Sequence, residues 1–286
     1  MWLVTGAQGM LGTDLRAVLE RHGISHVGVD LGDLDLLDEA AVSAAVQGHD
    51  VVVNCAAWTA VDDAESHEDK AFTINAVAPA LLARAARTHD ARLIHLSTDY
   101  VFRGDGDQPY AEDAAPAPQS AYGRTKAAGE WAVRAEAPEH HIVLRTAWLY
   151  GAYGACFPKT IARVAHERGA VSVVDDQYGQ PTWTKDVAEQ MVRLVQSDAA
   201  PGTWHATSAG QTSWFGFARE IVSAAGLCPD VVSASDSTEF VRPAPRPAYS
   251  VLGHDRWRER GIQPIGDWLE RWRLASSEVL ALEETE

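Results

Sequence analysis

The feature that most restricts the fold of this chain is a glycine-rich stretch close to its start. The sequence VTGAQGMLG places Gly6, Gly9 and Gly12 at intervals of three residues, after a short apolar run and at the beginning of a helical pattern. Glycines at this spacing permit a tight turn, a close approach of the backbone to a pyrophosphate and close packing of a helix on a sheet. The amides and the positive dipole end at the helix N-terminus favour phosphate there. The stretch therefore predicts a dinucleotide-binding turn, and a glycine-rich turn without a ligand is the alternative.

The first half of the chain alternates between short apolar, β-branched runs and longer amphipathic stretches. The runs predicted as strands are 2–6, 26–30, 50–57, 92–99 and 141–151, and the stretches predicted as helices are 9–22, 37–47, 67–89 and 120–136. Strands that are apolar throughout are typical of a parallel sheet with helices on both faces. We expect an α/β fold: a Rossmann-type doubly wound parallel sheet with a smaller C-terminal substrate-binding domain. Residues 1–151 are assigned to an NAD(P)-binding domain and residues 152–286 mainly to the substrate-binding domain, with later helices and strands returning to the first.

The second half follows a looser pattern. The stretch VSVVDDQYGQPTWTKDVA predicts a strand, a Gly/Pro loop and a helix start with Thr184 as its cap. Another capped helix is expected near 212–226. The prolines of RPAPRPAYS (242–250) exclude a regular element there.

The net charge and the cysteine pattern restrict the possible binding partners and the cellular compartment of the protein. The formal net charge of −16 argues against nucleic acid or an anionic membrane as a partner, because both require clustered Lys and Arg. No apolar run is long enough to span a bilayer, and the start of the chain shows no removable export segment. Cys55, Cys156 and Cys228 have neither disulfide-framework nor zinc spacing, which favours the cytoplasm. No His-Glu-x-x-His spacing is present, and no metal is assigned.

Asp30 closes the second predicted strand, where an acidic residue can accept hydrogen bonds from an adenosine ribose. An aspartate there disfavours a 2′-phosphate and so favours NAD over NADP. Asp33 or Asp35 could take the same role, an arginine nearby could restore phosphate binding, and Asp30 could simply form a turn. NADPH and NADH are therefore both kept as expected cofactors.

Tyr122 and Lys126 lie four residues apart in SAYGRTKAAGE, at the start of a predicted helix that Ser120 caps. Residues at this spacing share one helix face. A nearby ammonium lowers the pKa of a phenol from its usual value of about 10, so we expect Lys126 to bring the pKa of Tyr122 towards neutrality. Thr98 ends the fourth predicted strand at the same sheet edge as the glycine turn, where its hydroxyl could polarise a substrate carbonyl. Together the three predict a proton-transfer site, with Lys126 also holding a nicotinamide ribose; a chance surface pair of Tyr122 and Lys126 is the alternative.

These motifs resemble the extended short-chain dehydrogenases/reductases, and within them the dTDP-4-dehydrorhamnose reductases. The resemblance covers nearly the whole chain. The matching stretches are VTGAQGMLG, VVVNCAAWTAVDDAE, INA, STDYVFRGDG, PYAEDAAPAPQSAYGRTKAAGE, LRTAWLYG, VVDDQYGQPTWTKDVA, TSWFGFAREI and RPAPRPAYSVL. The last four narrow the resemblance within the superfamily.

The resemblance implies roles for residues that spacing alone does not assign. By position, Thr98, Tyr122 and Lys126 are implied to be catalytic. The residues implied for cofactor binding are Gly6, Gln8, Gly9, Met10, Leu11, Gly12, Asp30, Asp35, Leu36, Cys55, Ala56, Ala57 and Asn75, together with Tyr122 and Lys126. The residues implied for substrate binding are Trp58, Thr59, Ala60, Val61, Thr98, Asp99, Tyr100, Trp148, Gln177, Pro181, Thr182 and Arg246. On residue type alone, Trp148 could equally be a core residue and Arg246 a solvated one.

The implied reaction is an NAD(P)H-dependent reduction of the 4-keto group of a dTDP-4-dehydro-6-deoxyhexose, with hydride from the nicotinamide and a proton from the tyrosine. The product is dTDP-L-rhamnose or a related antibiotic sugar such as a dihydrostreptose precursor, and the sequence does not decide between them. One alternative function is a sugar-nucleotide epimerase or dehydratase. A dehydratase is expected to have acidic residues just after the catalytic threonine, and Asp99 follows Thr98. Another is a non-catalytic regulatory NADP-binding subunit, which the complete catalytic set disfavours. Cys55 replaces an expected alanine, and the acidic cluster of the magnesium-linked dimer of some relatives is not evident, so a homodimer stays open.

Overall fold

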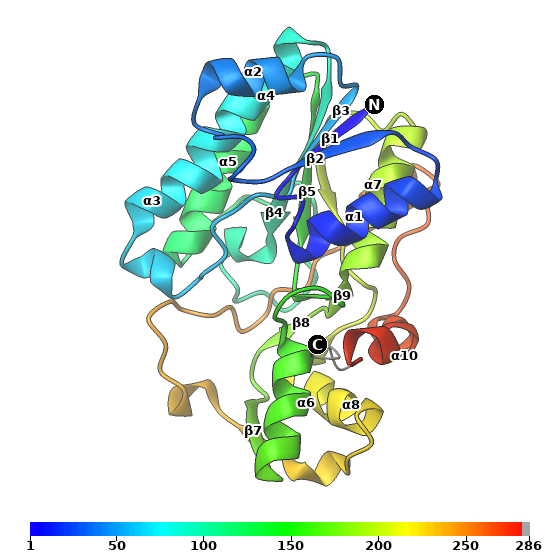
Figure 1. Cartoon of the computed structure of the whole chain (residues 1–286). Coiled ribbons are helices and arrows are strands. Elements are labelled where there is room, and N and C mark those ends of the chain that lie inside the picture. Colours follow the sequence, from blue (N-terminus) through cyan, green and yellow to red (C-terminus); the bar gives the residue numbers. More distant parts are fainter. Residues whose placement is uncertain (282–286) are drawn as a thin grey trace.

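The computed structural model of the chain describes residues 1–281 and contains a six-stranded parallel sheet in its upper part (Figure 1). The strand order is β10-β5-β4-β3-β1-β2, and every neighbouring pair is parallel. These strands are β1 (Trp2–Thr5), β2 (His26–Val29), β3 (Val51–Asn54), β4 (Arg92–Thr98), β5 (His141–Thr146) and β10 (Gly202–His205). The chain winds in opposite directions from β1, so β1 and β3 flank the switch point where doubly wound sheets bind ligands. The predicted Rossmann-type α/β fold is confirmed.

Helices cover both faces of this sheet, which explains why its inner strands are buried along their whole length and mostly apolar. On one face lie α1 (Met10–Arg21) and α7 (Thr184–Gln196), and on the other lie α2 (Glu39–Val46), α4 (Ala78–Thr88) and α5 (Ala121–Glu136) (Figure 1). Each face has its own core, with Leu15 and Met191 in one and Leu82 and Val133 in the other. Strand β10 and helix α7 come from the second half of the chain and complete the sheet and its cover.

The predicted helix over 67–89 is interrupted by a π-helical turn at Thr73–Val77, which separates α3 (Glu68–Phe72) from α4. Pro79 gives a physical reason, because it lacks the N–H that would bond to the carbonyl of Asn75 in a regular helix. Helix α5 packs closely at this point: a Cβ on Gly129 would lie 2.1 Å from the Asn75 carbonyl oxygen. The turn places the Asn75 side chain in the protein interior.

The lower part of the molecule is a smaller lobe with its own apolar core (Figure 1). Its main elements are α6 (Phe157–Arg168), β7 (Val171–Val174), α8 (Trp214–Ala224), β12 (Val232–Ser235) and α10 (Trp268–Val279). Short paired strands connect the lobes: β6 (Leu149–Tyr150) with β9 (Thr182–Trp183), and β8 (Tyr178–Gly179) with β11 (Thr212–Ser213). Helix α9 (Asp255–Glu259) follows the proline-rich segment, and short 3-10 turns are at Asp63–Glu65, Asp99–Val101, Pro229–Val231 and Ser237–Glu239. None of the helices in residues 1–281 is long and apolar enough to cross a membrane.

Several local predictions can be scored directly. Ser120 caps α5 by accepting from the amide of Gly123, as predicted. The capped helix expected near 212–226 is α8, where Ser213 accepts from the amide of Gly216. The prediction that Thr184 caps α7 is wrong. Thr184 is the first residue of the helix, and its hydroxyl instead contacts Asp14 and the carbonyl of Tyr150.

The expected single strand over 141–151 is also wrong, because it divides into β5 and β6. Trp148 lies between the two with a φ of +45°, a left-handed conformation that ends the pleat.

Candidate functional site

The glycine turn is folded too tightly for side chains at two of its three glycines. Gly6 has a φ of +65°, and a Cβ there would lie 2.7 Å from the amide nitrogen of Ala56 at the end of β3. A Cβ on Gly12 would lie 2.2 Å from the carbonyl oxygen of Gly6. Gly9 precedes α1 and offers no side chain to cap its amides. This cradle of bare backbone at a helix N-terminus fits the pyrophosphate of a dinucleotide.

The acidic residues predicted for the adenosine lie beside this turn. Asp30 follows β2, and its carboxylate accepts from the amide of Gln8 at 2.9 Å and from the amide of Leu31 at 3.1 Å. Asp30 therefore helps to fix the glycine turn. Asp35 accepts from the amide of Leu37, and Leu36 packs against the core under α2 and α4. Recognition of a ribose by Asp30 or Asp35 stays a prediction.

Thr98 and Tyr122 meet at the carboxyl end of the sheet. Thr98 is the last residue of β4, it is 6% exposed, and its side chain is hydrogen-bonded to that of Tyr122 from the first turn of α5. The Thr98 hydroxyl also donates to Asp99 at 2.9 Å and accepts from the amide of Tyr100. The Tyr100 ring lies edge-on to Tyr122, with ring centroids 5.6 Å apart. The structure thus brings together Thr98, Asp99, Tyr100 and Tyr122.

The expected effect of Lys126 on Tyr122 is wrong for this arrangement. Burial raises the pKa of Tyr122 to about 12, the hydrogen bond between its side chain and that of Thr98 opposes the rise, and the charge of Asp99 adds to it. Lys126 lies one turn further along α5 and is 2% exposed, and its Nζ donates to the carbonyl of Leu96 at 2.6 Å. Burial lowers the pKa of Lys126 to about 8. Tyr122 is therefore a neutral phenol across the physiological pH range and can donate a proton.

Asp99 is a buried carboxyl group beside the hydroxyl of Thr98. It is 2% exposed, and burial raises its pKa to about 6 despite the hydrogen bond from Thr98. A carboxyl whose pKa is raised on folding leaves the native state most stable below its unfolded pKa of about 4, and this stability is lost as the pH rises through about 6. At neutral pH the charged Asp99 therefore opposes folding.

We expect Asp99→Asn to raise the free energy of unfolding by about 2–3 kcal/mol near pH 8, because the amide keeps the acceptor for Thr98 without the buried charge. The gain should shrink as the pH falls through about 6 towards 4. Urea denaturation of both proteins across this range measures it. If the gain in the free energy of unfolding did not change with pH, the raised pKa of Asp99 would be contradicted.

The loop after β3 carries the predicted substrate residues Trp58, Thr59, Ala60 and Val61. Buried Asn75 holds this loop: its side-chain oxygen accepts from the Trp58 amide at 2.8 Å, and its amide nitrogen donates to the Trp58 carbonyl and to Thr125. Trp58 and Tyr122 pack against the same small cluster of buried alanines. Asn75 thus supports the site through the Trp58 loop and α5. Cys55, Ala56 and Ala57 follow β3 directly, opposite Gly6.

Trp148 is pinned from several sides. Its ring stacks on Trp214 of α8 with centroids 3.5 Å apart and an angle of 8° between the planes. A Cβ on Gly179 would lie 2.4 Å from the Trp148 ring, and the amide of Thr182 donates to the Trp148 carbonyl. Thr146, two residues earlier, pairs in register with Thr98. Trp148 is therefore held just beyond the end of the sheet that carries Thr98.

The other predicted substrate residues are distributed around the junction of the lobes. Pro181 and Thr182 are buried, and the Thr182 hydroxyl donates to the carbonyl of Gln180. Gln177 donates to Ser237 at 2.7 Å, which ties it to the lower lobe. The structure does not bring Gln177 into contact with the Thr98 and Tyr122 pair through any described hydrogen bond.

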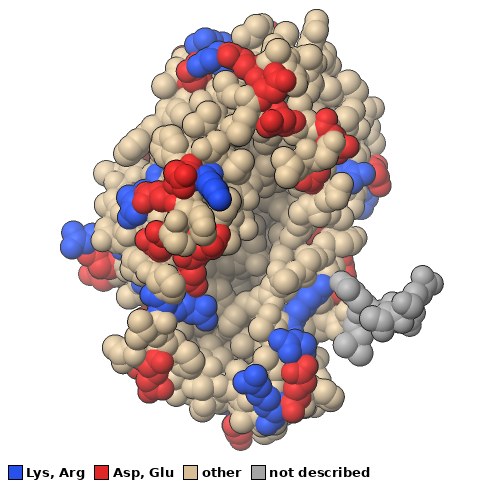
Figure 2. Space-filling view, turned by 60° about the vertical axis from the view of Figure 1, so that its left-hand side comes forward, with Lys and Arg blue, Asp and Glu red and all other residues tan. Residues whose placement is uncertain are grey.

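Arg246 connects the proline-rich segment to the loop after β3. Its Nη2 lies 2.8 Å from Oδ2 of Asp62, and Asp62 also accepts from the amide of Ala244. Arg246 and Tyr100 line one small cavity of about 50 Å³, together with residues of 102–120 and 245–247. Figure 2 shows a hollow in one face of the molecule, between the two lobes, with acidic and basic side chains on its rim.

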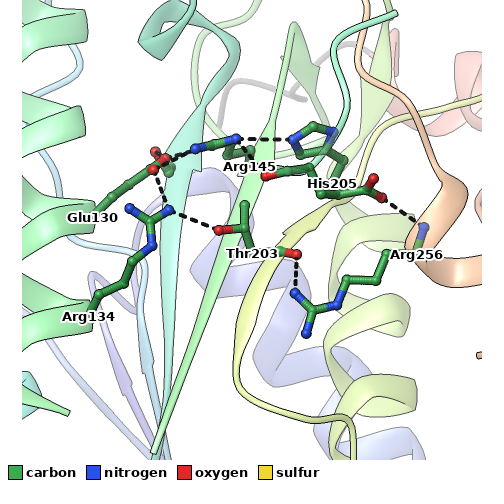
Figure 3. A network of polar contacts seen from close by, with 8 residues as sticks. Glu130, Arg134, Arg145, Thr203, His205 and Arg256 are labelled. Carbon is green, nitrogen blue, oxygen red and sulfur yellow. Dashed lines mark hydrogen bonds and ion pairs between the residues drawn. The ribbon is translucent and has the colours of Figure 1, made fainter. Parts of the chain in front are cut away.

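Three contributors to the site are missing from the sequence-based list. Asp62 pairs with Arg246, Trp214 supports Trp148, and Glu130 lies one turn beyond Lys126 in a buried ion pair with Arg145 (Figure 3). The spacing of four residues along Tyr122, Lys126 and Glu130 could have pointed to Glu130. Asp62 and Trp214 are each far along the chain from the residues that they contact, so no local pattern points to them. In residues 1–281 no group of three or more His, Cys, Asp or Glu side chains is placed to hold a metal ion.

The comparisons with known proteins agree with this geometry. A family model described as the RmlD substrate binding domain matches residues 1–281. A probable dTDP-4,6-dihydroxy-2-methyloxan-3-one 4-ketoreductase of Streptomyces antibioticus is 48% identical over 99% of this chain and 96% of its own. A dTDP-4-dehydrorhamnose reductase of Streptomyces griseus is 46% identical over 97% of this chain and 92% of its own. The chain belongs to the dTDP-4-dehydrorhamnose reductase family.

A solved member of this family has a closely similar structure. The dTDP-4-dehydrorhamnose reductase of Bacillus anthracis, in complex with NADP, superposes with a TM-score of 0.92 at 36% identity, over 96% of this chain and 97% of that one. The predicted family, the fold and the assignment as an NAD(P)-dependent oxidoreductase are confirmed. The individual residue roles within the dTDP-4-dehydrorhamnose reductase family stay predictions for this chain.

Proposed function

We propose that this chain uses NADPH or NADH to reduce the 4-keto group of a dTDP-linked 4-dehydro-6-deoxyhexose. The observation that carries the proposal is the hydrogen-bonded pair of Thr98 and Tyr122, with Tyr122 held as a neutral phenol, beside a glycine cradle that fits a pyrophosphate. The names of the relatives from Streptomyces support the sugar-nucleotide substrate. The substrate is proposed as dTDP-4-dehydrorhamnose or a related antibiotic sugar.

The residues present fit a dinucleotide. The backbone of Gly6, Gly9 and Gly12 would hold the pyrophosphate, and Asp30 lies where it would meet the adenosine ribose. Lys126 lies on the same face of α5 as Tyr122, where it would hold the nicotinamide ribose. The reduced nicotinamide, when bound, supplies the hydride.

The chain's own residues handle the substrate oxygen and its proton. Thr98 would donate a hydrogen bond to the keto oxygen and polarise it. Tyr122 would then donate its phenolic proton to the same oxygen as negative charge develops there. The raised pKa of Tyr122 suits this direction of transfer, because a phenolate would have no proton to give.

Arg246 would bind the diphosphate of the sugar nucleotide. A guanidinium forms two parallel hydrogen bonds with phosphate oxygens, and an ion pair with Asp62 holds the guanidinium of Arg246 in place. We expect Arg246→Ala to raise the KM for the dTDP-sugar by about 10–100-fold with a smaller change in kcat, because a charged hydrogen bond to the ground state is lost.

Arg242 provides the matched control for this prediction. It lies 3.5 Å from the same carboxylate of Asp62, but its side chain is 59% exposed. Arg242→Ala should change the KM by less than about threefold. If both substitutions changed the KM equally, the proposal that Arg246 binds the diphosphate would be wrong.

The direct test of the proposed function is cofactor oxidation by the purified protein. Absorbance at about 340 nm should fall when a dTDP-4-dehydro-6-deoxyhexose is added and should not change with dTDP-glucose. A dehydratase or epimerase would show no net oxidation, since it returns the hydride to its own product. A regulatory subunit would bind the cofactor without turnover of any of these sugars. Cytoplasmic location and a homodimer stay predictions; Cys55, Cys156 and Cys228 are all free thiols.

A further inference from the structure

Helix α5 carries a third buried ionisable residue on the face that presents Tyr122 and Lys126. Glu130 is one turn beyond Lys126 and has no exposed surface. It is too enclosed to exchange a proton with a substrate in the hollow. A buried carboxylate is costly unless it is paired and hydrogen-bonded, so its partners indicate what it does.

The partners of Glu130 come from three elements of the upper lobe (Figure 3). Its Oε1 accepts from Ser97 of β4 at 2.6 Å and from Nε of Arg145 of β5 at 2.8 Å. Its Oε2 accepts from Nη2 of Arg145 at 2.7 Å and from Arg134 at 2.9 Å. Burial on its own would raise the pKa of Glu130, but the hydrogen bonds and charge of Arg145 outweigh burial and hold the pKa below its ordinary value. Glu130 is therefore ionised.

Arg145 extends the pair across the sheet. It is 1% exposed, and its guanidinium lies 4.8 Å from the centre of the Phe102 ring and 3.4 Å from Nε2 of His205 on β10. Arg134 likewise donates to Thr203 of β10 (Figure 3). In the register of β4 and β5, Arg145 pairs with Ser97 and Thr146 pairs with Thr98. The ion pair therefore lies directly under the strand end that carries the catalytic hydroxyl.

Three consecutive residues of β4 are each held by a different turn of α5. The Leu96 carbonyl accepts from Lys126, the Ser97 hydroxyl donates to Glu130, and the Thr98 side chain is hydrogen-bonded to Tyr122. A shift of the helix along the strand would break all three contacts together. Of the three helix residues, Glu130 has no exposed surface and also forms an ion pair with Arg145.

We propose that Glu130 is a positioning residue, which with Arg145 fixes α5 against β4 so that Tyr122 meets Thr98, and whose negative charge keeps the Lys126 ammonium protonated. This inference rests on the catalytic roles proposed above for Thr98, Tyr122 and Lys126.

Glu130 is the charged group that acts on the protonation of Lys126. The ionisable groups that face it are Cys55 at the end of β3, His95 of β4, and Tyr122 and Glu130 of its own helix. Burial raises the pKa of Cys55 to about 12 and holds the pKa of His95 well below its ordinary value, so both are neutral. Tyr122 is neutral as well. Glu130 is thus the ionised partner in this set, and it opposes the lowering of the Lys126 pKa that burial causes.

The test compares Glu130→Gln with Asp186→Asn. Asp186 forms a two-bond ion pair with Arg271 at 2.7 and 2.6 Å, and no described hydrogen bond or ion pair joins it to α5 or β4. This pair is partly buried, so its loss reports the general cost of breaking a two-bond ion pair elsewhere in the fold. We expect Glu130→Gln to lower kcat about 10–100-fold with a smaller change in the KM for the sugar. The alkaline fall of kcat should move to lower pH by about one unit, because removal of the carboxylate charge lowers the Lys126 pKa. Asp186→Asn should leave kcat and its pH profile unchanged.

Two further measurements keep the outcomes separate. The Nζ signal of Lys126 in ¹⁵N-lysine NMR reports its titration without turnover, and it should move to lower pH in Glu130→Gln only. The double variant Glu130→Gln/Arg145→Met removes the unpaired arginine charge, so it should regain thermal stability without regaining the pH profile. Glu130 has only a structural role if the double variant regains both thermal stability and the parental pH profile of kcat. The same conclusion follows if neither the pH profile nor the Lys126 Nζ titration moves in Glu130→Gln. If Lys126→Met itself keeps full turnover, the proposed catalytic set is wrong, whatever Glu130 does.

Discussion

Replacement of Tyr122 by phenylalanine should lower kcat by about 10²–10⁴-fold and leave the affinity for NADPH or NADH nearly unchanged. The substitution removes one hydroxyl, which is the proton donor of the proposed reaction and the partner of Thr98. The ring stays packed against the small buried cluster near Trp58, so the fold should be preserved. Steady-state kinetics with the dTDP-sugar and fluorescence titration of the cofactor separate the two effects.

Tyr150→Phe is the matched control. Tyr150 is fully buried in the lower lobe, and its hydroxyl has no hydrogen-bond partner among the described residues. Loss of this hydroxyl should change kcat by less than about twofold. Near-normal turnover in Tyr122→Phe, with Tyr150→Phe also near normal, would show that the proton comes from another group, of which Asp99 would be the first to examine.

Gly12→Ala should weaken cofactor binding by at least about 100-fold. Its Cβ would lie 2.2 Å from the backbone oxygen of Gly6 and 2.8 Å from the Cα of Ala7, and neither atom can move without opening the turn. The pyrophosphate would then lose the close backbone approach that the turn provides. Isothermal titration with NADPH and NADH measures the loss, and circular dichroism shows whether the rest of the fold persists.

Gly32→Ala serves as the comparison, because nothing lies within 4 Å of a Cβ there and its backbone is not left-handed. This variant should bind the cofactor as the parent does. A Gly12→Ala protein that binds NADPH with parental affinity would mean that the turn is not the pyrophosphate site.

The sequence allowed the sheet and the catalytic edge to be predicted because the relevant signals are local. Apolar β-branched runs give strands, and Gly6, Gly9 and Gly12 combine their spacing with a strand before and a helix after. Tyr122 and Lys126 share a helix face at a spacing of four residues. Parallel strands then carry Thr98 to the same edge as the glycine turn, as the structure confirms.

What the sequence could not supply depends on tertiary neighbours. Trp148 turns into a left-handed conformation because Trp214 and Gly179 enclose it, and no local motif in LRTAWLYG indicates that break. Thr184 has the residue type of a helix cap, but buried Asp14 of α1 and the Tyr150 carbonyl take its hydroxyl. The pKa of Tyr122 is raised, opposite to expectation, because burial, which sequence spacing does not report, dominates and the charge of Asp99 adds to the rise.

The polar network around Glu130 shows the same limit at longer range. Arg145 follows Glu130 by 15 residues, but His205 is a further 60 residues along the chain, and Arg246 lies 184 residues from Asp62. Such pairs depend on the order of strands and on the packing of the two lobes. The sequence alone shows only that Glu130 follows Lys126 by four residues.

The most direct test of the central claim is to follow the hydride itself. The purified chain would be given NADPH or NADH deuterated at C4 of the nicotinamide, together with a dTDP-4-dehydro-6-deoxyhexose, and the product would be examined by NMR. We predict one deuterium on C4 of the sugar for each cofactor oxidised, with Tyr122→Phe slowing its appearance. Deuterium at another carbon, or a changed sugar without net cofactor oxidation, would contradict the 4-ketoreductase account.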